Sequence, residues 1–341
     1  MSKNLFLAIS IAILLALPCF VLAQTPSSPA EELRSAIARA EEYRQNAGNF
    51  EAASYFPSEW VVAEALYAEA RLLPTGSASE TNRAITAFTS VADSFAAMFR
   101  LTVSLYAQAR EDEIMIIRGG LIAGGARAVF PELMGPADQA ALTALDLYEV
   151  GDYRSARDYA TKAHIMFQIL ETSFSAWQMR QEIVRMGFMD YAMDNYERAE
   201  EVISEAMQAY IVGEFPAALE NAMEAQARYT LVLSSGWAVL AEYHSTLAKA
   251  ERTAAVEARA NVAAREVFEE ADFLYYTAVV SVRREYYREA AELFAGAEAL
   301  YLVARTSTLE RRRIAAEAIR EANRQIEETI RAAQQAELDS N

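Results

Sequence analysis

The chain has 341 residues, of which 53% are hydrophobic and 23% charged, so it is long enough to bury a sizeable core and is not disordered over most of its length. Acidic residues number 48 against 31 Lys and Arg, and the resulting net charge of -17 argues against general nucleic-acid binding. Only 8 prolines and 12 glycines interrupt the chain, too few for the turns of an all-β protein, so we expect an all-α fold.

The first 23 residues have the pattern of a secretory signal peptide. Lys3 supplies a positive start, an apolar stretch runs from Leu5 to Leu17, and Val21-Leu22-Ala23 is a small-residue cleavage pattern. We therefore expect an exported, periplasmic protein with a signal peptide at 1–23, and no other apolar run reaches membrane-spanning length.

Two alternatives to cleavage after residue 23 stay open. The apolar stretch could remain as a membrane anchor, or Cys19 could carry a lipid, although Pro18 is a poor neighbour for lipid attachment. Cys19 is the single cysteine. Cleavage would therefore leave a chain without disulfides, zinc-thiolate sites or cysteine nucleophiles.

After a Pro/Ser tether at 24–29, helical periodicity extends to the C-terminus. We divide this part into an N-terminal helical hairpin region at 30–118, a Gly/Pro-rich connection at 119–136, a helical repeat array at 137–304 and a charged C-terminal helix at 305–341. Helix breaks are predicted at Gly48-Asn49, Pro57, Pro74-Thr75-Gly76, the connection, Gly151-Asp152, Gly187, Gly213-Glu214, Gly236 and Arg283-Arg284-Glu285.

Three stretches of the chain align with one another without a gap: 137–167, 199–229 and 271–301. A weaker fourth copy begins at Phe56-Pro57, which matches Phe130-Pro131. Each copy predicts two antiparallel helices joined by a tight turn, with close alanine contacts between them. The matching positions are Ala144, Ala206 and Ala278; Tyr153, Phe215 and Tyr287; Ala156, Ala218 and Ala290; Ala163, Ala225 and Ala297; and Phe167, Tyr229 and Tyr301.

The turn and second helix of these copies resemble the tetratricopeptide repeat family. The matching residues are Tyr148, Gly151, Tyr153, Ala156, Ala160 and Ala163, repeated as Tyr210, Gly213, Phe215, Ala218, Ala222 and Ala225. The resemblance implies stacked hairpins that bind a partner. The chain departs from the family in its missing tryptophan and closing proline and in a period about twice as long. The segments around Tyr55-Phe56-Pro57 and Phe130-Pro131-Glu132 also resemble an uncharacterised alanine-rich helical domain of bacterial envelope proteins.

Possible catalytic or metal-binding groups are sparse. His164 and His244 are the only histidines, and neither has a further ligand at metal-binding spacing. The acidic pairs Glu31-Glu32, Glu200-Glu201 and Glu269-Glu270 are interpreted as solvated faces, because adjacent helical residues diverge. The run from Arg118 to Gly125 lacks the Gly-Lys-Ser/Thr ending of a phosphate loop, so we interpret it as a hinge or as a close helix crossing through Gly120 and Gly124. We predict no catalytic, cofactor or metal site.

Trp60, Trp177 and Trp237 are interpreted first as packing residues and second as a ligand surface. Arginine supplies nearly all the basic charge, which favours ion pairs with carboxylates over anion capture. In the C-terminal helix, Ile319, Ala322, Ile326 and Ile330 form a narrow stripe. We interpret that helix first as a cap on the array and second as a contact for a partner helix.

The sequence therefore predicts a noncatalytic scaffold or adaptor in the cell envelope, which binds a protein partner through a helical-repeat surface. The alternative is a binding module for peptidoglycan fragments or an apolar small ligand. No residue can be assigned to the binding face from the sequence.

Overall fold

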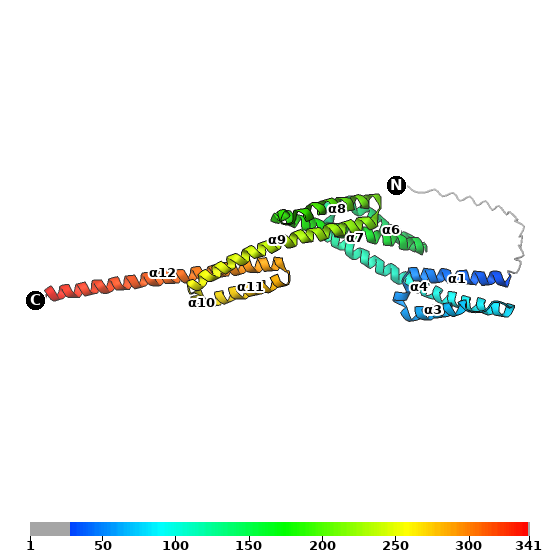
Figure 1. Ribbon diagram of the computed structural model, residues 1–341, viewed down its shortest axis with the longest axis horizontal. Helices are drawn as coiled ribbons and strands as arrows, with labels where there is room; N and C mark the ends of the chain where they lie inside the picture. The colour runs from blue at the N-terminus through cyan, green and yellow to red at the C-terminus, as the bar shows by residue number, and fades with distance from the viewer. Residues whose placement is uncertain (1–27, 340–341) are drawn as a thin grey trace, which may run out of the picture. The chain divides into compact units, whose positions relative to one another are not determined.

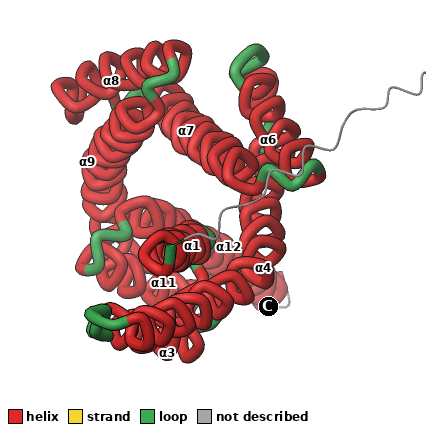
Figure 2. The backbone as a smooth tube through the Cα atoms, turned by 90° about the vertical axis from the view of Figure 1, so that its right-hand side faces the viewer, coloured by secondary structure: helices red, strands yellow, loops and turns green. Residues whose placement is uncertain are grey.

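The computed structural model describes residues 28–339, and in that range the backbone forms helices and connecting turns with no strand (Figure 2). The expected all-α fold is confirmed for this range. The predicted signal peptide, Cys19 and most of the tether lie outside the described residues.

Long helices alternate with shorter ones along the chain (Figure 1). In chain order they are α1 (Pro29–Asn49), α2 (Ala52–Tyr55), α3 (Pro57–Arg71), α4 (Ala78–Ala123), α5 (Ala126–Val129), α6 (Met134–Glu149), α7 (Tyr153–Met186), the 3-10 turn η1 (Met189–Ala192), α8 (Met193–Val212), α9 (Phe215–Glu257), α10 (Ala260–Ala263), α11 (Arg265–Arg283) and α12 (Tyr287–Asp339).

The chain divides into two compact units, and the boundary falls inside α4 between Arg110 and Glu111. In the first unit, α1, α3 and the first part of α4 enclose one apolar core. Its centre holds Ala40, Ala63 and Phe95, each 1% exposed or less. A capping box at Ser28 starts α1, because the Ser28 hydroxyl accepts from the Glu31 amide while the Glu31 carboxylate accepts from the Ser28 amide.

The second unit is built from three-helix groups that share their long helices. The first part of α9 packs against α7 and α8, and its last part packs against α11 and α12 (Figure 1). The end of α4 packs with α6 and α7 in the same way, through Ile114 and Leu121. A long helix therefore contributes one half to each of two successive cores.

The alanines aligned in the sequence lie inside these cores. Ala156, Ala218 and Ala290 are buried, and so are the other two aligned alanine sets. The aromatic residues that end each copy, Phe167, Tyr229 and Tyr301, have no exposed surface. Small side chains let the helix backbones approach, and the aromatic side chain fills the space beside them, as predicted.

Two kinds of break recur between the helices. In one, a residue with positive φ precedes a one-turn helix: Glu51 before α2, Gly125 before α5, Gly187 before η1 and Arg259 before α10. In the other, a positive-φ residue ends a short helix: Gly151, Gly213 and Glu285. The predicted turn at Arg283-Arg284-Glu285 is therefore present, with a glutamate at φ 62° where the other copies have glycine.

One predicted helix break is wrong, and one break in the structure was not predicted. Gly236 does not break a helix, because it lies inside α9, where its missing side chain makes room for the ring of Phe188. The break at Arg259 was missed because no glycine or proline marks it.

The C-terminal helix was expected to cap the array, and this is wrong for its last part. Arg311 donates a hydrogen bond to the Ala263 carbonyl oxygen at 2.7 Å, but every side chain from 314 to 334 is exposed. The predicted stripe at Ile319, Ala322, Ile326 and Ile330 therefore covers no other described part of the chain.

Within residues 28–339, four arginine–carboxylate pairs share the same separation in the sequence. In each pair the arginine Nε lies 2.6–2.7 Å from a carboxylate oxygen of the residue twenty positions later. The pairs are Arg44–Glu64, Arg118–Asp138, Arg180–Glu200 and Arg252–Asp272. Each pair joins the end of one helix to the short helix that runs back along it, so the pairs fix the register of the two helices.

In two of the four pairs a buried tyrosine adds a third group. The hydroxyls of Tyr229 and Tyr301 donate to Glu200 and Asp272 at 2.5 Å. Burial alone would raise the pKa of Asp272, but hydrogen bonds from Arg252 and Tyr301 hold it below its ordinary value. Burial, together with the bond to the carboxylate, raises the pKa of Tyr301. Glu200 was interpreted as part of a solvated face, and this is wrong, because it is half-buried and paired.

We expect Asp272→Asn to weaken the fold in a pH-dependent manner. Because the pKa of Asp272 is lowered by folding, its stabilising contribution is complete above the unfolded value of about 4 and is lost as the pH falls through the folded value. The variant should lose about 1–3 kcal/mol of unfolding free energy at pH 7, and the difference from the parent chain should shrink at pH 3. Urea unfolding of the variant and of the parent chain at pH 7 and pH 3 measures the two differences in unfolding free energy.

The control for that experiment is Glu269→Gln, which removes the exposed pair of Glu269 with Arg265. Exposed ion pairs within one helix contribute little to stability. The unfolding free energy of this variant should therefore stay within about 0.5 kcal/mol of the parent value. A loss for Asp272→Asn that is the same at pH 3 and pH 7 would show that the carboxylate charge is not what stabilises the fold.

Gly236→Ala should destabilise the protein, because the added Cβ would overlap the ring of Phe188. Overpacking of this kind costs about 1–3 kcal/mol, more than the gain of up to about 1 kcal/mol from replacing a helical glycine. Gly120→Ala is the matched control, since an added Cβ there meets nothing within 4 Å, and it should be neutral or stabilising. Thermal unfolding compares the two variants, and equal melting temperatures would contradict the close approach at Gly236.

Candidate binding groove

Histidine and carboxylate groups do not assemble a reactive cluster in residues 28–339. His244 Nδ1 lies 3.1 Å from Glu298 Oε2, and His164 Nε2 lies 3.7 Å from Glu113 Oε2. No set of three or more His, Cys, Asp or Glu side chains in the described range is placed to hold a metal ion. Each of the two pairs links neighbouring helices, α9 with α12 and α4 with α7.

The glycine run at 118–125 forms a close helix contact at one of the two expected positions. An added Cβ at Gly124 would lie 2.8 Å from Phe174 on α7, whereas one at Gly120 meets nothing within 4 Å. Gly125, with φ 86°, then forms the turn into α5. These glycines serve packing and chain reversal.

The three tryptophans do not converge on one site. Trp60 packs against Phe95 in the core of the first unit, with ring centroids 5.3 Å apart. Trp237 donates from Nε1 to Glu182 at 3.2 Å and packs against Phe188. Trp177 is 37% exposed and stacked on Phe174. For Trp60 and Trp237 the structure agrees with the interpretation as packing residues.

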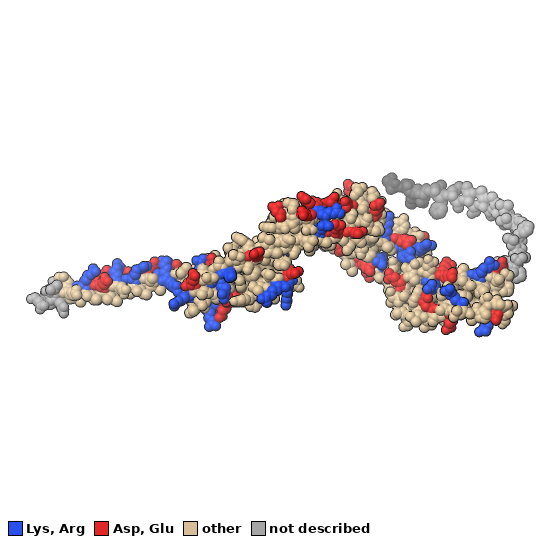
Figure 3. Space-filling model, viewed as in Figure 1, with Lys and Arg blue, Asp and Glu red and all other residues tan. Residues whose placement is uncertain are grey.

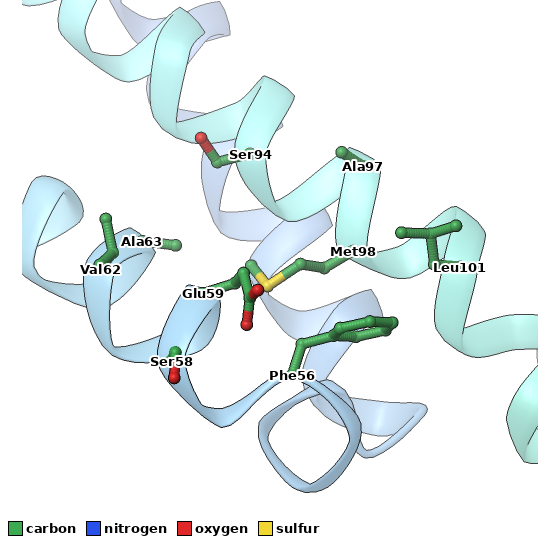
Figure 4. A pocket seen from close by; sticks show the side chains of 9 residues that line it. All are labelled: Phe56, Ser58, Glu59, Val62, Ala63, Ser94, Ala97, Met98 and Leu101. Carbon is green, nitrogen blue, oxygen red and sulfur yellow. The ribbon is translucent and has the colours of Figure 1, made fainter.

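An open groove of about 580 Å³ lies on the first unit between α3 and α4 (Figure 4). In the close-up, Glu59 and Met98 extend toward each other near its middle, and Val62 and Leu101 lie at opposite sides. The lining residues come from α3, from the residue just before it and from α4: Phe56 before α3, Ser58, Glu59, Val62 and Ala63 on α3, and Ser94, Ala97, Met98 and Leu101 on α4.

Large apolar side chains stand exposed on both walls of the groove. Val62 is 59% exposed and Leu101 is 57% exposed. One helical turn further along each helix, Leu66 and Leu105 are also exposed. Residues four apart share a helix face, so the apolar faces of α3 and α4 continue beyond the groove, in opposite directions, past the residues that line it.

The groove contains one ionisable side chain, Glu59. It is exposed in the first turn of α3 and forms no ion pair with another residue of the described range. The arrangement offers an apolar channel with a single negative group, without a nucleophile and base in mutual contact. It is suited to noncovalent binding of an apolar segment that also carries a positive charge.

Sequence reasoning did not find this groove, although part of the signal was present. The pairs Val62/Leu66 and Leu101/Leu105 have the spacing of an apolar helix face. From the sequence alone such a face is assigned to the core. Only the structure shows that no other helix of the first unit covers it.

Comparison of the sequence with family models and curated proteins, and of the fold with solved structures, finds no match. Among the described helices, none combines the length and the apolar character that crossing a membrane requires.

Val62→Lys combined with Leu101→Lys should remove the apolar character of the groove and leave the fold intact. Both side chains are more than half exposed, so the unfolding free energy should change by less than about 1 kcal/mol. Fluorescence of the dye ANS, which brightens on exposed apolar surface, should fall for the variant. Unchanged ANS fluorescence would show that the groove offers no accessible apolar surface.

Proposed function

We propose that the protein is an exported, noncatalytic adaptor that binds a partner protein in the cell envelope through the groove between α3 and α4. The single observation that carries the proposal is that each wall of an open channel presents an exposed aliphatic side chain, Val62 on α3 and Leu101 on α4. Apolar side chains gathered in a groove are typical of surfaces that bind another protein. Export rests on the signal-like pattern of the first 23 residues.

An amphipathic helix of the partner is the segment that best suits this channel. Two helices with a groove between them offer the same geometry that a third helix occupies in a helix bundle. The apolar face of the partner helix would contact Val62 and Leu101, and a lysine or arginine on it would pair with Glu59. Such a groove needs no cofactor.

The alternative, a peptidoglycan fragment or an apolar small ligand, is less well supported. Sugar recognition depends on convergent hydrogen-bonding groups, and the lining offers only Ser58, Ser94 and Glu59. The groove is also open along its length, whereas small-ligand sites enclose most of the ligand surface.

A photo-crosslinking amino acid at Ala97, inside the groove, tests the proposal in envelope extracts of the producing cells. We expect a discrete crosslinked protein band from Ala97 and none from the same amino acid at Gln45, an exposed position on α1. Adding Val62→Lys should reduce the crosslinked band at least about tenfold, because it places a charge against the apolar face of the partner.

Two results would contradict the proposal. Equal crosslinking from Ala97 and Gln45 would mean that the groove has no preferred partner. Purification of the protein with bound sugar or lipid, and without a crosslinked protein at Ala97, would favour the small-ligand alternative.

A further inference from the structure

The last part of α12 is a helix without a neighbour in the described chain. Thr308 is the last buried residue among those whose burial is described, and every side chain from 314 to 334 is exposed. The ion pairs in this segment are formed within the helix itself, such as Arg313–Glu317 and Arg324–Glu321. We call residues 314–334 the terminal segment; it is about 30 Å long at 1.5 Å per residue.

An apolar stripe on the terminal segment continues the face that α12 buries in its folded part. Tyr301, Ala304 and Thr308 lie on that buried face. Further steps of three and four residues pass Arg311 and then lead through Ala315, Ile319, Ala322, Ile326, Ile330 and Ala333. The isoleucines of the stripe remain 51–61% exposed, and Figure 3 shows charged atoms along one edge of this helix and few along the other. The stripe is therefore a packing face that the described chain leaves uncovered.

Neutral amide side chains border the stripe on both sides. Asn323 stands at one edge, four residues after Ile319 and three before Ile326, and Gln325 stands at the other edge. The Asn323 side chain forms no hydrogen bond with another described residue, so its amide offers both a donor and an acceptor. The charged residues Arg320 and Glu327 lie further round the helix.

These positions match a second copy of the same helix running in the opposite direction. When Ala322 of each copy lies opposite Ile326 of the other, Ala315 meets Ala333 and Ile319 meets Thr329. Small and large side chains then face each other near the centre of the contact. In such a pair, which is symmetric about a two-fold axis, Asn323 of one copy lies beside Asn323 of the other. The NH2 group of each amide can then donate a hydrogen bond to the carbonyl oxygen of the other.

Other arrangements are less favourable. If one helix of the antiparallel pair slides by seven residues along the other, Asn323 lies beside Ile330 of the second copy. If it slides by seven residues in the opposite direction, Asn323 lies beside Ala316 of the second copy. A parallel pair would place Asn323 beside Ala318. In each case the amide loses contact with water without gaining a partner, so the polar edges select one orientation and one register.

We propose that the protein forms a dimer through antiparallel pairing of the terminal segments of two copies, with Asn323 specifying the register by facing itself across the two-fold axis. The contact contains about six successive layers of facing side chains, many of them alanines, and buries little area. The dimer is therefore reversible, with a dissociation constant on the order of micromolar. It is independent of the proposed function, but it would join two grooves in one assembly and strengthen binding to a partner with two sites.

The pairing is tested by placing a charge at Asn323, the position that faces itself in the dimer. The protein used is the chain that starts at Gln24. Analytical ultracentrifugation over a range of concentrations should show a monomer–dimer equilibrium for the parent. Asn323→Glu and Asn323→Lys should each raise the dissociation constant at least about tenfold, because each brings two like charges together. An equal mixture of the two variants should dimerise again, since one copy then supplies the glutamate and the other the lysine.

The same two substitutions at Gln335 are the matched control. Gln335 is a neutral, exposed amide residue near the end of the same helix, but it lies on the side opposite the stripe, so in the proposed register its side chain points away from the second copy. Gln335→Glu and Gln335→Lys should therefore dimerise like the parent. All variants should keep the parent melting temperature, since the altered residues are outside the folded cores. A chain that stays monomeric at every concentration, or a mixture that fails to recover dimerisation, would overturn the proposal.

Spin labels determine the direction of the helices. Arg324 and Arg331 both lie on the side opposite the stripe, and the chain from Gln24 on contains no natural cysteine. In the antiparallel register, labels on the two copies are level along the axis at Arg324→Cys and offset by about 20 Å at Arg331→Cys. Equal distances at the two positions would indicate a parallel pair and would contradict the proposed register.

Discussion

Close approach of helix backbones at buried alanines is the constraint on which the rest of the structure depends. Ala156, Ala218 and Ala290 have at most 6% of their surface exposed, and each faces a short helix that runs back along its own long helix. An alanine contact buries little area by itself, so the helices must be held in one register for many such contacts to form together. The arginine–carboxylate pairs at twenty-residue separation supply that register, and the buried tyrosines fill the space that the alanines leave beside them.

The sequence predicted the parts of this arrangement that depend on local spacing. The all-α fold, the buried alanines and the turns at Gly151, Gly187 and Gly213 all follow from residue types at helical or turn positions. Positions whose role is set by tertiary packing were not predicted. Gly236 is a residue type that often ends a helix, but here it lies inside α9 and leaves space for the side-chain ring of Phe188. Arg259 shows the converse, because the turn before α10 places an ordinary side chain at positive φ, a strain of about 1–2 kcal/mol that surrounding helix packing must offset.

The groove could not be predicted because exposure depends on which neighbours are missing. Val62 and Leu101 lie on apolar helix faces of the same kind as those that are buried elsewhere in the chain. Sequence patterns report that a face is apolar, but not whether another element of the fold covers it. The repeated arginine–carboxylate spacing was missed for a related reason. The sequence contains many arginines and acids, and only the structure shows which of them meet across two helices.

The width of an apolar helix face determines how many helices can pack on it, and this distinguishes the end of α12 from the internal helices. The last part of α9 buries Ala241, Ala248 and Ala255 and contacts both α11 and α12, so its apolar face is wide. The terminal segment of α12 has a narrow stripe, bordered by the amides of Asn323 and Gln325. A face of that width has room for one neighbouring helix. Further hairpin packing would bury the Asn323 amide without a hydrogen-bond partner, and it would bury the Gln325 amide together with the Glu321 carboxylate to which it donates. The terminal segment is therefore unsuited to continue the series of three-helix groups, and its pattern fits the contact with a single helix on which the proposed dimer depends.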